Sequence, residues 1–466
     1  MRMRKEKTNK FEYLTETPVP ELILRLSVPT IISMLVTGIY NSADTFFVGR
    51  ISENGTGATA AVGLVFPIMA VIQAVAFMFG HGSGNTLSRM LGAGKKKEAS
   101  EMAATGFALA ILTGIVFAVF GNIFTGPTIR FFASEEITTA TFHMTEDYAR
   151  IILLGAPFTM GQFVINNQLR FQGSAVYAMV GLLSGAVLNM FLDPVLILMC
   201  GMGVKGAAIA TVVGQMVSFF VLLYGSRMGD NVRPHVKNIR INGYYVGQII
   251  NGGIPSLFRQ GLAALATTLL NKAAGEYGAL INEETATAAI AAMTICTRVM
   301  MLLASALIGF GQGYQPVCSF NYGAGKKNRV REGYLFCLRW GAVFLLVVSS
   351  LCYIYAPQVI RFFRKDADVV AVGKVALRYQ AMALPLLAVT IMTNMMLQSI
   401  GKGVKASILA SARSGIFFIP AILILPRIYG LTGVEIAQSV ADVFAAALAV
   451  PLAVSELRKM KEERTV

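Results

Sequence analysis

The chain has 466 residues, of which 55% are hydrophobic and only 14% are charged, and its mean hydropathy is +0.62. Soluble domains carry about 25% charged residues, so this composition excludes a soluble domain and indicates a polytopic helical membrane protein. The formal net charge of +15 does not indicate nucleic-acid binding, because the basic excess of a membrane protein normally lies in its cytoplasmic loops.

Long apolar runs with few or no charges recur along the whole chain, and a bilayer core requires about 20 such residues per helix. We therefore expect an all-α polytopic membrane protein with twelve transmembrane helices. The expected helices run approximately over 20–48, 58–91, 98–122, 138–168, 173–199, 206–226, 245–275, 284–320, 329–355, 368–399, 404–426 and 432–456.

Lys and Arg concentrate in every second connection. The basic segments are 2–10, 89–97, 227–240, 326–331, 402–405 and 458–464, and Arg170 is expected in a loop on the same side. This bias predicts a multi-pass protein of the cell (plasma) membrane with both termini in the cytoplasm. Arg361, Arg364 and Lys365 break the trend on the opposite side, where we expect a short surface helix.

The apolar run at 173–199 carries an acid in its interior. Asn189 and Asp193 lie four residues apart, which places them on one helical face. Pro194 follows directly and is expected to kink the helix and to free a backbone carbonyl group. An ionised Asp within a bilayer costs about 3 kcal/mol, so it requires a polar cavity, a partner, a proton or a cation. The alternative is a purely structural clasp between helices.

The two halves of the chain repeat each other. Gly80-x-Gly82 and Gly92-Ala93-Gly94-Lys95-Lys96 match Gly311-x-Gly313 and Gly323-Ala324-Gly325-Lys326-Lys327 at a constant spacing of 231 residues. These glycines are expected to permit close helix packing. Six helices per half give both halves one topology, so we expect two lobes related by a pseudo-two-fold axis along the membrane normal. The expected division is an N-terminal six-helix lobe at 1–226, a cytoplasmic basic linker at 227–244 and a C-terminal six-helix lobe at 245–466.

With these features the chain resembles the bacterial multidrug and toxic compound extrusion (MATE) antiporters over nearly its whole length. The resemblance also rests on the segment Asn41-Ser42-Ala43-Asp44-Thr45-Phe46-Phe47-Val48-Gly49 in the first helix. It implies a V of two lobes that exports amphiphilic, mainly cationic small molecules in exchange for protons or sodium ions. No cofactor and no nucleic-acid partner are expected. A monomer in the lipid bilayer is expected, because one chain already holds both halves.

The family pattern maps a cation-coupling cluster onto this chain. The positions are Asp44 in the first helix, Asn189 and Asp193 in the fifth, and Thr211 in the sixth. Two carboxylates with an amide and a hydroxyl group can share a proton, or they can offer oxygen ligands to a sodium ion; no other metal site is expected. The family's substrate-lining positions fall on Tyr40 and Asn166, and Gln215 is a further candidate.

The second half lacks this cluster, because Ile419-Pro420 stands where the first half has Asp193-Pro194. Some family members carry their key acids in helices 7 and 8, but this chain has Arg259 and Arg298 there. Arg413 and Asp442 lie within apolar runs of the same half, and we expect them to form a neutralising structural pair.

The alternative function is a lipid-linked oligosaccharide or lipid flippase of the same superfamily. Those proteins have basic residues lining the cavity, and Arg259, Arg298 and Arg413 fit that pattern. Twelve helices and the acidic cluster argue against it, because such flippases usually have more helices. An ATP-driven pump is not expected, since the sequence has no Walker A motif. An enzyme is not expected, since no nucleophile, acid–base or metal constellation is evident.

Overall fold

The computed structural model describes residues 10–48, 55–132 and 138–462, with the side chains of 38–48, 55–56, 131–132 and 462 left out of the description. These residues are almost entirely helical, as expected. The N-terminal lobe contains α2 (Val19–Val48), α3 (Gly55–Gly92), α4 (Lys96–Ile123), α6 (Thr139–Phe171), α7 (Ala175–Pro194) with the π-turn η1 (Val195–Met199), and α8 (Gly203–Gly225).

The C-terminal lobe repeats this order with more breaks in its helices. It contains α9 (Gly243–Ala279), α10 (Glu283–Gly323), α11 (Lys327–Ile354), α13 (Ala367–Ala383) continued through η3 (Leu384–Leu386) by α14 (Leu387–Ser399), α15 (Gly403–Ser411) continued through the π-turn η4 (Ala412–Ile416) by α16 (Phe418–Tyr429), and α17 (Leu431–Glu462). The shorter elements are α1 (Lys10–Glu16), α5 (Thr125–Phe132), η2 (Val236–Asn238) and α12 (Ala356–Phe363).

The described chain therefore has twelve long helical segments, six in each lobe, and the expected fold class is confirmed. Eleven of the twelve are long and apolar enough to cross a membrane. The twelfth, α9, is not among them, and it carries Arg259 and Gln260 in its central part.

Glycines in the left-handed conformation end the repeated helices. Gly94 has φ of 77° after α3, and Gly325 has φ of 73° after α10. In each case the following lysine donates its backbone N–H to the carbonyl oxygen five residues back, from Lys95 to Met90 O at 2.9 Å and from Lys326 to Asn321 O at 2.8 Å. Only glycine adopts this conformation without strain, which explains the two Gly-Ala-Gly-Lys motifs.

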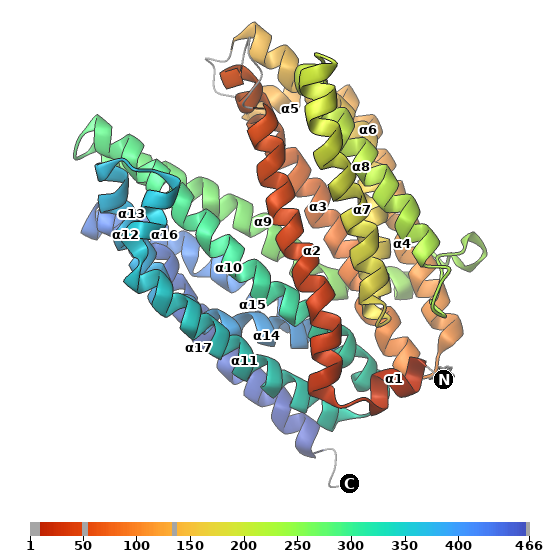
Figure 1. The fold of residues 1–466 in the computed structure, drawn as a ribbon. Helices are drawn as coiled ribbons and strands as arrows, with labels where there is room; N and C mark the ends of the chain where they lie inside the picture. Colours follow the sequence, from red (N-terminus) through yellow and green to blue (C-terminus); the bar gives the residue numbers. More distant parts are fainter. Residues whose placement is uncertain (1–9, 49–54, 133–137, 463–466) are drawn as a thin grey trace, which may run out of the picture.

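The two lobes form a V (Figure 1). Their helices lie together at the end where both chain termini lie, here called the termini side, and diverge toward the opposite end, here called the open side. Helix α3 of the first lobe packs on α9 and α10 of the second, and α2 packs on α10. In the sequence repeat, α2 and α3 of the first lobe correspond to α9 and α10 of the second. The contact of α3 with α9 therefore has its counterpart in the contact of α10 with α2, as a two-fold relation between the lobes requires.

The repeated glycines lie at these contacts. A Cβ atom on Gly82 of α3 would collide with the carbonyl oxygen of Ile249 in α9, and one on Gly313 of α10 would collide with Ser27 of α2. Gly92 and Gly323 approach each other's helices in the same way, against the carbonyl oxygens of Phe320 and Arg89. The expectation that these glycines permit close packing is confirmed, and the packing joins the lobes on the termini side.

A short helix precedes the fourth long segment of each lobe. Helix α12 (Ala356–Phe363) contains Arg361, and Arg364 follows it, so the expected surface helix is confirmed. Helix α5 (Thr125–Phe132) occupies the equivalent place in the first lobe and was not anticipated from the sequence.

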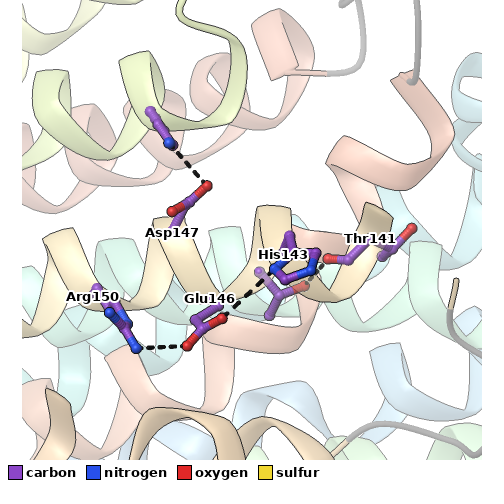
Figure 2. Close-up of polar contacts among 7 residues, drawn as sticks. Thr141, His143, Glu146, Asp147 and Arg150 are labelled. Carbon is purple, nitrogen blue, oxygen red and sulfur yellow. Dashed lines mark hydrogen bonds and ion pairs between the residues drawn. The ribbon is translucent and has the colours of Figure 1, made fainter. Parts of the chain in front are cut away.

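The open-side end of α6 is polar (Figure 2). Glu146 pairs with Arg150 at 2.7 Å, His143 Nδ1 lies 3.9 Å from Glu146, and Asp147 pairs with Lys205 of α8 at 3.1 Å. These side chains are largely exposed, so each pair stabilises the fold by about 1 kcal/mol or less.

Candidate functional site

A stripe of small and polar residues runs along α7. Gly181, Gly185, Asn189 and Asp193 follow each other at intervals of four, and all four are buried. Residues four apart share one face of a helix, so the two glycines bring the neighbouring helix close and the two polar side chains follow on the same face. Asp193 is 0% exposed.

Helix α8 presents the complementary face. A Cβ on Gly185 would collide with the carbonyl oxygen of Gly214 in α8, and one on Gly214 would lie 3.1 Å from Cβ of Asn189. Ser218 Oγ donates to the carbonyl oxygen of Gly181 at 2.6 Å. This close crossing places Thr211, which is buried one turn before Gly214, against Asn189.

Three of the predicted cation-coupling residues therefore lie together. In the amide orientation that satisfies both of its neighbours, Asn189 donates from its amide nitrogen to Asp193 Oδ2 at 3.2 Å and accepts from the backbone N–H of Thr211 at 3.1 Å. With the amide turned over, Nδ2 of Asn189 lies 3.3 Å from Asp193 Oδ1 and 3.4 Å from Thr211 Oγ1. In both orientations an N–H group faces the Asp193 carboxylate. Among the described side chains, the cluster thus brings the neutral Asn189 and Thr211 together with the Asp193 carboxylate.

The helix changes its hydrogen bonding immediately after this acid. Pro194 ends α7, and residues 195–199 form the π-turn η1, in which the N–H of Cys200 donates to Val195 O at 2.8 Å. Proline removes one helical hydrogen bond, and π-turns often lie at functional sites in helices. The α-helical hydrogen-bond pattern thus changes directly after Pro194, and the expected kink stays a prediction.

The remaining first-lobe candidates lie on α2, α6 and α8. Tyr40 and Asp44 belong to α2, which packs along α7 and α8, but their side chains lie outside the described residues. Gln215 of α8 follows Thr211 by one turn and accepts a hydrogen bond from Thr159 Oγ1 of α6. Gln215 is therefore next to the Asp193 cluster.

Asn166 lies elsewhere. Its Nδ2 donates to the carbonyl oxygen of Ala178 at 2.8 Å, about three helical turns from Asn189. Asn394 in the second lobe donates to Ala406 O at 2.6 Å, and both members of that pair lie 228 residues after their first-lobe counterparts. The Asn166 amide thus links α6 to α7 in a contact that both lobes repeat.

The burial of two charged residues was not predicted from the sequence. Arg170 is not a loop residue as expected: it lies in the last turn of α6 and is only 2% exposed. Its partners, His81 and Gln312, are the residues between the repeated glycine pairs, which is the signal that could have indicated them. Glu435 is buried in the first turns of α17, and among the described residues it has no hydrogen bond or ion pair.

The expected pair in the second lobe is present. Arg413 Nε donates to Asp442 Oδ1 at 2.8 Å, and Gln438 Nε2 donates to the same oxygen at 2.9 Å. Arg413 lies in the π-turn η4, about ten residues before the segment that matches η1 in the sequence repeat. The neutralising pair is confirmed.

Comparison with known proteins agrees with this architecture. The family model MatE matches residues 29–195 and 266–423. The chain is 26% identical over 445 residues to "Multidrug export protein MepA" of Staphylococcus haemolyticus, with 95% of each chain covered. It is also 26% identical over 462 residues to "Multidrug export protein MepA" of Staphylococcus saprophyticus, with 97% of each covered.

A solved structure has a similar fold. "Outward-facing conformation of a multidrug resistance MATE family transporter of the MOP superfamily" superimposes with a TM-score of 0.88 at 26% identity, covering 98% of this chain and 100% of that one. Fold, length and sequence thus agree over nearly the whole molecule.

Proposed function

The chain belongs to the MatE family of multi-pass multidrug transporters, and from this premise we propose that it is an antiporter exporting amphiphilic, mainly cationic compounds in exchange for protons or sodium ions. Family members are transporters rather than enzymes, and their substrates are small molecules.

The observation that supports this proposal is the setting of Asp193. Its carboxylate is fully buried in an apolar span, and the neighbours described for it, Asn189 and Thr211, are neutral. An ionised acid in that position costs about 3 kcal/mol, which binding of a proton or cation would relieve. Asp44 and Thr211 complete the proposed coupling site.

Competition at this site would couple the two ligands. A cationic compound is held by a deprotonated Asp193, and binding of the coupling cation removes that attraction. Each ligand then weakens the binding of the other, and the coupling is reciprocal. The π-turn after Pro194 gives α7 a local irregularity through which the change at Asp193 can alter the lobe.

The cluster can serve either coupling ion. In both orientations of the Asn189 amide an N–H group faces the carboxylate, and a protonated Asp193 still accepts that hydrogen bond on its second oxygen. The amide oxygen lies beside the other carboxylate oxygen in both orientations, so it is also available to a sodium ion. We propose the proton as the coupling ion to test first, with Asp44, Asn189, Asp193 and Thr211 as the sodium ligands if it is not.

The open side is proposed to face the exterior of the cell. The basic tails and the basic loops that follow α3 and α10 lie on the termini side, which the distribution of Lys and Arg predicts to be cytoplasmic. The similar structure is described as outward-facing. The protein would then act as a monomer in the plasma membrane, with Tyr40 and Gln215 lining the substrate path.

The flippase alternative loses one of its three arginines in the second lobe, because Arg413 is neutralised by Asp442. Arg298 is exposed on α10 and has no ion pair among the described residues. Arg259 is considered separately below.

Ethidium movement in proteoliposomes tests the proposed function. An imposed pH gradient is expected to drive ethidium transport by the wild type, and Asp193→Asn is expected to abolish that drive, because the amide cannot bind a proton. A sodium gradient applied at equal pH identifies the other ion. The matched control is Asp147→Asn, which removes an exposed acid at the open side and should leave transport unchanged.

If neither gradient moves the dye in the wild type, drug antiport is contradicted. If Asp193→Asn transports as well as the wild type, the antiporter stands but its coupling site lies elsewhere, and the buried Glu435 is the next residue to replace.

A further inference from the structure

A group of basic side chains lies between the lobes, apart from the Asp193 cluster. Arg170 follows Asn166 by one turn on α6, and Asn166 contacts Ala178 at the beginning of α7. Asp193 lies about four turns farther along α7. The two groups are thus at different levels of the molecule.

Arg170 is held by neutral partners. It donates to Gln312 Oε1, to Asn167 Oδ1 at 2.6 Å and to His81 Nε2 at 3.2 Å. His81 Nδ1 lies 3.1 Å from the carbonyl oxygen of Phe77 and donates to it, so its Nε2 is the acceptor for Arg170 and the ring is neutral.

Arg170 lies close to the pseudo-two-fold axis. His81 stands between Gly80 and Gly82, and Gln312 stands between Gly311 and Gly313. The two partners thus occupy equivalent positions in the two lobes, and one guanidinium group contacts both of them. A group that touches both members of a symmetry-related pair lies near the axis that relates them.

A second arginine lies near the first. Arg259 of α9 donates to Asn394 Oδ1 at 3.4 Å. Asn394 precedes Met395, whose sulfur contacts Gly311 beside Gln312. The charge of Arg259 is close enough to act on both Arg170 and His81.

In the part of the chain that the structure describes, no acid forms an ion pair with Arg170 or Arg259. The acids of that part form their ion pairs with other basic residues. Arg170 is 2% exposed, and its Nε–H group is buried with no hydrogen-bond partner. Burying an unpaired charge is costly, and an unmade buried hydrogen bond adds to that cost. Arg259 is only partly buried, but its positive charge near Arg170 adds repulsion, which an anionic partner would relieve.

We propose that Arg170 and Arg259 form a binding site for the carboxylate group of a transported compound. The planar guanidinium fork matches a carboxylate in two parallel hydrogen bonds, and the unused Nε–H of Arg170 supplies one of the donors. This inference rests on the proposed transport function, which it extends to a second class of charged group.

Access to the site follows from the contacts between the lobes. The Arg170–Gln312 hydrogen bond joins the lobes, as do Ser319 Oγ to Asn85 Oδ1 at 3.0 Å and Arg89 to Ser399 O at 2.9 Å. Separation of the lobes on the termini side would break these bonds and leave Arg170 open to a ligand. The anionic group would therefore bind when the molecule opens on that side.

A matched pair of dyes tests the proposal. Rhodamine 110 has a free carboxylate, and rhodamine 123 is its methyl ester with the same xanthene cation. Binding of each dye to the purified full-length protein is measured by fluorescence anisotropy. We expect Arg259→Gln to weaken rhodamine 110 binding at least tenfold and to leave rhodamine 123 binding within twofold, and Arg259→Lys to retain part of the rhodamine 110 affinity.

Two controls test whether a loss of binding is specific to the proposed site. Arg427→Gln removes an exposed arginine at the end of α16 and should change neither affinity. Rhodamine 123 binding reports correct folding of each variant. This control matters most if Arg170→Gln is also measured, because that change removes several hydrogen bonds.

The proposal is overturned if Arg259→Gln weakens both dyes equally or neither, or if the wild type binds rhodamine 123 but not rhodamine 110. Those results leave the proposed antiport intact. Conversely, if no gradient drives ethidium but rhodamine 110 binding still depends on Arg259, the antiport proposal fails and the carboxylate site stands.

Discussion

Two buried acids in membrane-spanning helices differ in their surroundings. Asp442 is paired with Arg413 and receives a second hydrogen bond from Gln438, so its charge is compensated within the lobe. Asp193 accepts a hydrogen bond from the neutral Asn189, which also contacts Thr211. The first arrangement pairs an acid with a base in the same lobe, and the second places an acid beside an amide, which is why Asp193 is the residue proposed to bind the coupling ion.

The Arg413–Asp442 pair gives a stability prediction. Asp442→Asn should destabilise the protein by on the order of 3 kcal/mol, because it leaves Arg413 without its counter-charge. Adding Arg413→Gln should recover much of that loss. Thermal unfolding of the detergent-solubilised variants measures both effects. A double variant no more stable than Asp442→Asn alone would show that the pair is not the source of the destabilisation.

Single residues were predictable from the sequence where their chemistry contrasts with the span around them. Asp193 stands out because acids are rare in apolar runs, and Asn189 shares its face by simple spacing. Arg170 did not stand out, because it lies at the end of an apolar run where a basic loop residue is normal. Only the packing of α3 and α10 around it shows that this end of α6 is inside the molecule.

At the scale of elements, the crossing of α7 and α8 sets the geometry of the candidate site. Backbone contact at Gly185 and Gly214 fixes the distance between the helices, and Asn189 and Thr211 meet one turn beyond the glycines. The position of the acid cluster is therefore determined by residues that carry no functional group.

Gly185→Ala tests this dependence. The new methyl group would collide with Gly214 O and lie 2.8 Å from Ser218 Cβ, so the helices must separate. Overpacking of this kind costs about 1–3 kcal/mol, and the shift should uncouple ethidium transport from the gradient. Gly63→Ala is the control, because a Cβ there meets open space. Gradient-driven transport at the wild-type rate in Gly185→Ala would contradict this account of the site.

Helix positions followed closely from the sequence because apolar length and glycine termini are local signals. The ends of α3 and α10 agree with the two Gly-Ala-Gly-Lys motifs, whose glycines adopt positive φ. The π-turns η1 and η4 and the short helix α5 were harder to predict from the sequence. Proline indicates a break but not its hydrogen-bond pattern, and α5 is too short to give a clear apolar period.

At the scale of the whole molecule, the two lobes share a fold but not a charge distribution. The first carries the Asp193 cluster, and the second carries a neutralised pair and contributes Arg259 to the centre. The sequence repeat predicted the symmetry and its glycine contacts. The central arginines depend on residues from α3, α6, α9 and α10 meeting at one place, which no single segment reveals.

The central claim is that a proton and a cationic substrate compete for Asp193. The most direct measurement is proton release on substrate binding: ethidium is added to the purified protein in weakly buffered detergent solution, and the pH change is followed. We predict the release of up to one proton per bound ethidium by the wild type and none by Asp193→Asn. Equal release by both proteins would contradict the claim, and so would the absence of release together with ethidium binding that sodium does not weaken.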